Sequence, residues 1–327
     1  MARWGTVSMY FPFLRGKQFE LLAIKEMAHE LGRLGNFHPV IEPVKDIRGN
    51  GGFARGLQAL ASAAVPSTVI VNPQVGELAK LDSNPDAVIR DLRPLLDADR
   101  SLRLGLVLSS ERQVSEAVLA LRRWNIHRPV DLIYTDAVLP LESMMEIQSN
   151  LDIGLHFLDG KESVRRYRKV FPNPQSVLLR DRFPRKPRNQ DYVDVRESVF
   201  SEDHLFFKDD GYVGFGDYQT VGTYYAEGGS LPRTVAIHLT YLDGSDNAVY
   251  IRHFCSDSNN GTSDTAGKFS EAVRKLLEFT DVRRIQNPSI DAFRKYHFSG
   301  NFPGLGMLKK LSIQNHLYVM ASALEVR

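Results

Sequence analysis

The feature that most constrains this chain is an alternation of short apolar runs with segments of helical periodicity over its first 180 residues. The segments between the runs, such as Lys17–Leu34 and Phe53–Ala64, space their apolar residues as amphipathic helices do. Strand–helix alternation of this regularity predicts βαβ units and a parallel sheet. Seven runs are almost continuously apolar, as is typical of parallel strands covered on both faces: Ser8–Leu14, Phe37–Val44, Ser67–Val71, Leu102–Leu108, Val130–Thr135, Leu151–Leu158 and Ser176–Leu179.

Two α/β architectures satisfy this pattern, a doubly wound sheet and a (β/α)8 barrel. The G-x-G-x-x-G fingerprint of dinucleotide-binding sheets is absent after the first run, and the length of 327 residues accommodates a barrel. We therefore predict one TIM-like barrel domain over residues 1–327, with Thr234–Leu242 as its eighth strand. Residues 181–231 are predicted to form a cap inserted after strand 7, and residues 243–327 a C-terminal hairpin and helical extension.

Simple counts exclude several classes of protein. Cys255 is the only cysteine, so the chain has neither an internal disulfide nor a zinc ribbon, which favours a reducing cytoplasm. No apolar run approaches the roughly 18 residues that a membrane-spanning helix needs. The N-terminus lacks the basic, apolar and small-residue regions of a secretion signal. We therefore expect a cytoplasmic protein with no membrane partner.

The N-terminal segments carry a resemblance to a known family. Tyr10–Glu20 reads YFPFLRGKQFE and His38–Val44 reads HPVIEPV. These segments, together with Gly214–Tyr218 (GFGDY) and Ala236–Tyr241 (AIHLTY), resemble the beta-protein family of bacterial and phage genomes. The resemblance implies a barrel-like α/β fold and a setting near mobile or phage-defence genes. It implies no particular reaction and therefore assigns no catalytic residue.

The polar residues that follow the predicted strands are the candidates for chemistry, because the site of a barrel lies at the carboxyl ends of its strands. A mixture of carboxylates, histidine and cations suits acid–base or metal-assisted chemistry on a phosphate ester, although salt bridges at strand ends explain the same residues. Lys45 is the cation nearest to Glu42 in the sequence. The predicted catalytic residues are Glu42, Asp136, Asp159 and His238; the predicted phosphate ligands are Arg15, Lys17, Lys45 and Arg180; Asp217 is predicted to reach the site from the cap.

A basic segment stands out against a net charge of only +2 for the whole chain. Residues 161–188 hold ten basic and two acidic side chains, a local charge of +8. Such a segment suits a phosphate backbone, an acidic protein partner or simply a solvated face. The residues expected to bind nucleic acid or a partner protein are Arg182, Arg185, Lys186 and Arg188.

Two functions remain open at this point. One is a barrel protein that binds a phosphorylated ligand or nucleic acid and hydrolyses a phosphoric ester, with a divalent metal as the cofactor that the carboxylates suit. The other is a non-catalytic scaffold that binds a partner, such as the product of a neighbouring gene, within a defence or immunity module. The absence of H-E-x-x-H, G-x-S-x-G and similar motifs favours the second function, and the crowding of ionisable groups at strand ends favours the first.

Overall fold

The computed structural model describes residues 8–45, 47–49, 51–80, 84–136, 139–159, 167, 170–171, 175–228 and 231–325. The chain divides into two compact units. The first contains residues 1–180 and 206–217, and the second contains residues 181–205 and 218–327. The segment 181–231, expected as one inserted cap, is therefore shared between the two units.

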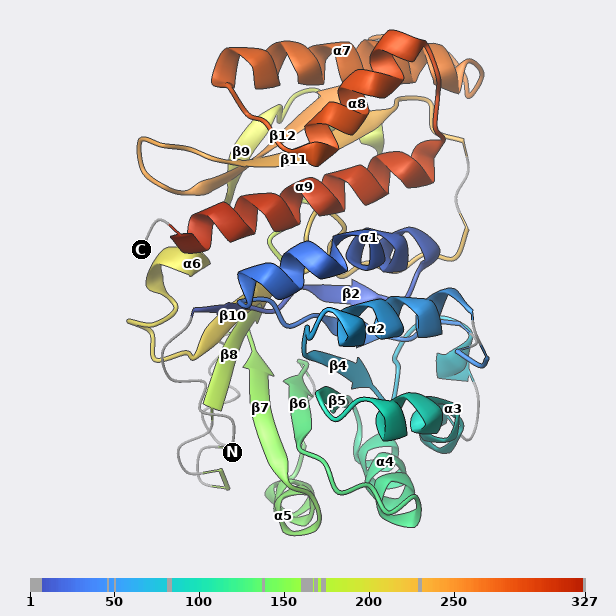
Figure 1. Ribbon diagram of the computed structural model, residues 1–327, viewed down its shortest axis with the longest axis vertical. Coiled ribbons are helices and arrows are strands. Elements are labelled where there is room, and N and C mark those ends of the chain that lie inside the picture. Colours follow the sequence, from blue (N-terminus) through green and yellow to red (C-terminus); the bar gives the residue numbers. More distant parts are fainter. Residues whose placement is uncertain are drawn as a thin grey trace. The chain divides into compact units, whose positions relative to one another are not determined.

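The first unit is built on a nine-stranded parallel sheet in the order β1-β10-β8-β7-β6-β5-β4-β3-β2 (Figure 1). Consecutive helices contact one another along the sheet, as the predicted βαβ alternation requires. The strands are β1 (Met9–Tyr10), β2 (Phe13–Arg15), β3 (Val40–Glu42), β4 (Ser67–Ile70), β5 (Leu102–Leu108), β6 (Val130–Tyr134), β7 (Ile153–Leu158), β8 (Gln175–Arg180) and β10 (Gly214–Asp217). The helices are α1 (Gln18–Leu34), α2 (Gly52–Ser62), η1 (Leu78–Lys80), α3 (Asn84–Ala98), α4 (Glu111–Arg123) and α5 (Leu141–Asn150). Residues 161–171, which follow β7, lie largely outside the described residues.

The two outermost strands of this sheet, β1 and β2, are separated in the chain only by Phe11 and Pro12. Phe11 N–H donates to the carbonyl of Phe215 at 2.8 Å, whereas Val40 N–H donates to the carbonyl of Pro12 at 2.9 Å. One short stretch of chain thus forms hydrogen bonds with strands at both edges of a strongly curled sheet. Because Pro12 has no N–H to donate, the stretch is divided into two strands, and the sheet differs from the unbroken eight-stranded barrel predicted from the sequence.

The prediction that Thr234–Leu242 is the eighth strand of this sheet is wrong. The strand beside β8 is β10, a segment whose two glycines resemble a turn in the sequence. Its glycines have a steric role, because a Cβ on Gly216 would fall far inside van der Waals contact of the carbonyl oxygen of Phe11. Only glycine lets these two backbones approach so closely.

The concave face of the curled sheet is identified by side chains that meet across strands that are not neighbours. The rings of Phe11 and Phe157 lie 5.3 Å apart, edge to face, and Phe11 lies 5.2 Å from the ring of His38. The Thr68 hydroxyl of β4 donates to Asp131 Oδ2 of β6 at 2.7 Å across the intervening β5. Such contacts require the sheet to curl around this face.

A buried polar network occupies the amino-terminal part of the concave face. Asp131 is fully buried and accepts hydrogen bonds from Arg103 Nε at 3.0 Å, from the Thr68 hydroxyl and from the backbone N–H of Leu155 at 2.8 Å. His38 Nε2 lies 2.8 Å from the Thr68 hydroxyl. The network meets the requirement that a buried charge be both paired and hydrogen-bonded.

The second unit is an α/β layer with a three-stranded antiparallel sheet in the order β11-β12-β9. Strands β11 and β12 form the predicted hairpin, and three helices follow them within the predicted helical extension. One face of the sheet contributes Ile237, Leu239 and Phe254 to a hydrophobic core with these helices. The elements are η3 (Asn189–Tyr192), β9 (Glu197–Ser201), β11 (Ala236–Leu242), β12 (Val249–Cys255), α7 (Thr265–Arg283), α8 (Pro288–Ser299) and α9 (Leu305–Glu325); the short helix α6 (Asp203–Phe206) spans the boundary between the units.

Candidate functional site

Arg15 and Glu42 form a buried pair at the carboxyl ends of β2 and β3, where they are register partners. Arg15 Nε donates to Glu42 Oε2 at 3.4 Å, and the side chains are 11% and 4% exposed. Val40, two residues before Glu42, is the register partner of Thr68 in the buried network. Side chains alternate along a strand, so Arg15 and Glu42 lie on the concave face.

The environment of Glu42 shifts its protonation equilibrium towards the neutral acid. Burial raises the pKa of the Glu42 carboxyl, and the Gln74 backbone N–H, which donates to Oε1 at 2.6 Å, and the Arg15 guanidinium oppose this rise. Lys45, the cation nearest in the sequence, instead pairs with Glu77 at 3.3 Å on the surface. A buried carboxyl with a raised pKa suits acid–base chemistry, but it equally completes a structural ion pair.

The remaining predicted residues of the first unit do not join this pair. Arg180 and Asp217 are register partners of each other, on the face that also carries Tyr10, whose hydroxyl donates to Asp217 Oδ1 at 2.7 Å. Arg180 Nε donates to the backbone carbonyl of Asp159 at 3.0 Å. This face is opposite to the concave one. Val177 of β8 is the register partner of Phe157 and so lies on the concave face, and Arg180 is three residues after Val177, so its side chain projects from the other face. Arg180 and Asp217 therefore point away from Arg15 and Glu42.

Three further predicted residues lie elsewhere. Asp136 is exposed, Lys17 is the residue that precedes α1, and His238 belongs to the second unit. Within the described ranges, no group of three or more His, Cys, Asp or Glu side chains has the arrangement of a metal site. The described contacts thus do not assemble the predicted acid–base and phosphate residues into one centre.

Much of the basic segment 161–188 is neutralised or lies outside the described residues. Arg182 binds Asp203 through two hydrogen bonds, at 2.8 and 2.5 Å. Arg188 pairs with Asp191 at 2.9 Å, and the Arg185 guanidinium lies 3.1 Å above the ring of Tyr224. Residues 161–166, 168–169 and 172–174, which hold five of its basic residues, are not described. Of the four predicted binding residues, Lys186 is the one whose charged group has no partner among the described residues.

A row of three side chains crosses the sheet of the second unit. His238 of β11 is the register partner of His253 of β12, and the His253 N–H donates to the carbonyl of Arg196 at 2.8 Å. This hydrogen bond and the pairing of Arg252 with Glu197 place Arg196, the residue before β9, opposite His253. Directly opposed residues project from the same face. His238, His253 and Arg196 are therefore neighbours on the face opposite to the helical core.

The two histidines of this row form an uncharged hydrogen-bonded pair. Their Nδ1 atoms lie 2.8 Å apart, and the Tyr192 ring covers both, at 4.7 Å from His238 and 4.4 Å from His253. Burial lowers the pKa of His238 to about 3, with a further contribution from His253. Burial, followed by the charge of Lys186, lowers the pKa of His253 to about 4. Both rings are neutral at pH 7.

One atom of this pair lacks a partner. In two neutral imidazoles joined through Nδ1, one ring donates and the other accepts, so each ring still has one nitrogen to satisfy. The Nε2 of His253 is buried and has no hydrogen-bond partner within the described part of the chain. A buried polar atom without a partner costs free energy, which a ligand that bonds to it would recover.

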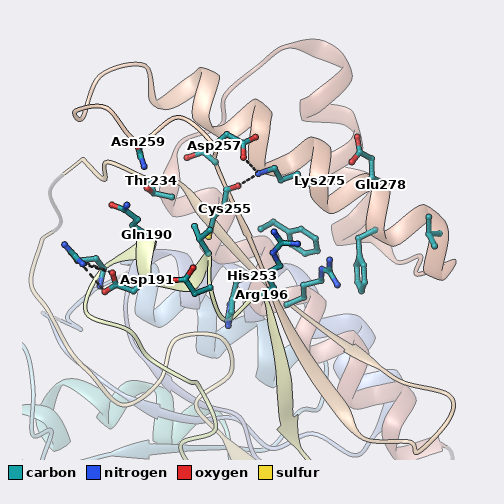
Figure 2. A pocket seen from close by; sticks show the side chains of 18 residues that line it. Gln190, Asp191, Arg196, Thr234, His253, Cys255, Asp257, Asn259, Lys275 and Glu278 are labelled. Carbon is teal, nitrogen blue, oxygen red and sulfur yellow. Dashed lines mark hydrogen bonds and ion pairs between the residues drawn. The ribbon is translucent and has the colours of Figure 1, made fainter.

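His253 and Arg196 line a pocket of about 850 Å³ in the second unit (Figure 2). Three cations of its wall have carboxylate partners: Arg188 with Asp191, Lys275 with Asp257 at 2.6 Å, and Arg252 with Glu197 at 2.9 Å. Among the described residues, the side chains of Arg196 and Asp194 have no partner. The wall also includes Val193, Phe254, Phe279 and Val282.

Sequence reasoning missed this site, although a signal for it was present. His238 and His253 lie at equal distances from the middle of the 243–248 loop, so a hairpin brings them opposite each other. The alternation of His238 with Ile237 and Leu239 also placed it on the less apolar face. Arg196 gave no signal, because its position depends on the pairing of β9 with β12 across more than 50 residues.

Comparisons with known proteins identify no family for this chain. No family model matches the sequence and no curated protein matches it, so the resemblance to the beta-protein family and its phage-defence setting stay predictions. A mutant O-GlcNAc hydrolase from Thermobaculum terrenum has a TM-score of 0.42 at 13% identity, covering 66% of this chain and 56% of that chain. N-acetylneuraminate lyase from Mycoplasma synoviae has a TM-score of 0.36 at 10% identity, covering 64% and 67%.

A beta-aspartyl dipeptidase from Fervidobacterium islandicum has a TM-score of 0.32 at 13% identity, covering 88% of this chain and 66% of that chain. At these TM-scores the likenesses carry no inference about activity. The chain spans about half of the length of the hydrolase and about two thirds of the other two. None of the helices in the described ranges has both the length and the apolar character needed to cross a membrane.

Proposed function

We propose that this protein binds a small phosphorylated ligand in the pocket of its second unit. The observation that carries the proposal is the pairing of Arg196 with His253 on one face of the sheet, at the pocket wall. Arg196 offers a guanidinium whose charge no described carboxylate neutralises, and His253 offers a buried Nε2 without a partner. A guanidinium suits phosphate because it donates two parallel hydrogen bonds.

The charges around this pair favour an anion. Lys186 lies close enough to lower the pKa of His253, so a second positive charge lies near the same ring. The tautomer in which His238 Nδ1–H donates to His253 leaves a proton on His253 Nε2, which can then donate to a phosphate oxygen. Four carboxylates also line the wall; Asp194 is one of them, and it is exposed to solvent.

The first unit is proposed to act as a TIM-barrel-like scaffold. Its two edge strands, β1 and β2, come from one short stretch of chain. This proximity supports the proposal that the curled sheet serves as a barrel-like scaffold. Hydrolysis of a phosphoric ester has less support than binding, because Asp217 lies on the face opposite to Glu42 and Asp136 is exposed.

The proposal is tested by titrating the purified full chain with inorganic phosphate in a calorimeter. Arg196→Gln is expected to weaken phosphate binding by about tenfold or more, because a hydrogen bond to a charged group contributes roughly 1.5–3 kcal/mol. Arg122→Gln is the matched control, since Arg122 is an exposed arginine of α4 in the first unit. Asp194→Asn is expected to tighten binding about twofold by removing a like charge.

Two results would contradict the proposal. One is the absence of binding at low salt, where attraction between exposed charges is strongest. The other is an equal affinity for phosphate in the wild type and in Arg196→Gln, which would place the anion elsewhere on the molecule. Thermal unfolding of each variant, measured without phosphate, separates loss of binding from loss of folding.

A further inference from the structure

The wall of the pocket also contains an apolar part. Val282 of α7 is 83% exposed and Val193, which follows η3, is 42% exposed, so two of the exposed large hydrophobic side chains in the described ranges line this one cavity. Phe254 and Phe279 line it as well. A solvated valine at a cavity wall gains free energy when an apolar group covers it.

Arg252 completes this part of the wall without adding a free charge. Its guanidinium lies 4.4 Å above the centre of the Phe279 ring and donates to Glu197 at 2.9 Å. The Arg252–Glu197 pair marks the point at which β9 ceases to follow β12. Beyond it, residues from both faces of the sheet line the same pocket, with Arg196 and His253 from one face and Phe254 from the other.

The volume of the pocket fits a ligand with two parts. About 850 Å³ lies within the range of roughly 300–1,000 Å³ in which proteins hold small organic molecules, which is far more room than an inorganic anion needs. Such pockets typically combine apolar walls with a few placed polar groups. Here most of the lining is polar and includes Arg196 and His253, and the apolar part of the wall is Phe254, Phe279 and the two valines.

We propose that the ligand is an organic phosphate with an apolar or aromatic body, its phosphate bound by Arg196 and His253 and its body against Val282, Val193 and Phe279. This inference rests on the proposed function, because it assumes that the anion occupies the Arg196–His253 side. It adds the chemical class of the ligand, which inorganic phosphate alone does not define.

The experiment compares three probes on the full chain by calorimetry: inorganic phosphate, phenyl phosphate and phenol. Phenyl phosphate is expected to bind at least about tenfold more tightly than inorganic phosphate, since burial of a ring of this size is worth that factor or more. Val282→Ser is expected to weaken the binding of phenyl phosphate about threefold and to leave the affinity for inorganic phosphate unchanged. Val199→Ser is the matched control, because Val199 is 50% exposed on β9 and does not line the pocket.

The outcomes separate this inference from the proposed function. Equal affinities for phenyl phosphate and inorganic phosphate, both lost in Arg196→Gln, would overturn the two-part ligand and leave the anion site standing. Binding of phenol as tight as that of phenyl phosphate would also overturn it, because the phosphate would then contribute nothing. If neither phosphate probe binds, the proposed function itself fails. An effect of Val282→Ser on phenyl phosphate alone, absent in Val199→Ser, supports the inference.

Discussion

Gly154→Ala is expected to destabilise the first unit strongly, although it adds only one methyl group to a strand. A Cβ at this position would lie 2.5 Å from Asp131 Oδ1 and closer still to the guanidinium of Arg103. Carbon and nitrogen atoms that are not bonded prefer separations of about 3.5 Å or more, so the guanidinium has to move away. The ion pair with the fully buried Asp131 would then break.

The size of the effect follows from what Asp131 loses and keeps. Loss of one partner from a buried ion pair costs roughly 3–5 kcal/mol. Asp131 keeps its hydrogen bonds from Thr68 and Leu155, so we expect the lower end, about 3 kcal/mol. Urea unfolding followed by the fluorescence of Trp124, which lies at the end of α4, measures this in the first unit. Gly52→Ala is the control, because a Cβ on Gly52 meets nothing within 4 Å.

A second background tests the mechanism. In Arg103→Met the guanidinium is absent, so adding Gly154→Ala should cost no more than half of its cost in the wild-type protein. If Gly154→Ala costs the same in both backgrounds, the backbone and not the ion pair sets the requirement for glycine, and the reasoning is refuted. A change below about 0.5 kcal/mol in the wild-type background would refute it as well.

Three further changes are expected to alter stability. Gly216→Ala should cost more than about 3 kcal/mol in urea unfolding, because its Cβ would meet the rigid carbonyl of Phe11; a stable variant would exclude the close approach. His38 is neutral in the folded state, where burial lowers its pKa to about 4, against 6.5 in the unfolded state. The stabilisation that neutral His38 gives the folded state is therefore complete above pH 6.5 and is lost as the pH falls towards 4. At pH 4.5 the loss of stability amounts to roughly 2–3 kcal/mol. The free energy of unfolding, measured at pH 7.5 and at pH 4.5, should differ less between the two pH values in His38→Asn than in the wild type. Arg15→Met should cost about 3 kcal/mol by stranding Glu42, and adding Glu42→Gln should restore part of it; no restoration would mean that the two residues act independently.

The parts of the fold that follow local rules were predictable from the sequence. The helical periodicity of Lys17–Leu34 and Phe53–Ala64 placed α1 and α2 within a few residues, because burial of one helix face sets that period. The position of β10 was not predictable, since Gly214 and Gly216 resemble a turn until the Phe11 backbone is known to lie against them. Local patterns carry no information about such distant neighbours.

The same distinction applies to the candidate site. The pairing of Arg15 with Glu42 follows from their positions at the ends of adjacent parallel strands, and both were identified. Arg180 was misplaced, because one residue of register decides which face a strand residue occupies. The site on the second unit required the partner of β12 to be known, and that pairing joins segments more than 50 residues apart.

The pairing of β1 with β10 has a consequence for synthesis of the protein. Met9 is the register partner of Gly214, so the first strand of the chain leaves the ribosome about 205 residues before its neighbour. At roughly 5–20 residues per second this delay lasts about 10–40 seconds. During that time one edge of the nascent sheet is open to other chains, which is the situation in which holding chaperones are useful. A ribosome-stalled chain that ends before residue 214 should therefore be more prone to aggregation than one that extends past residue 217.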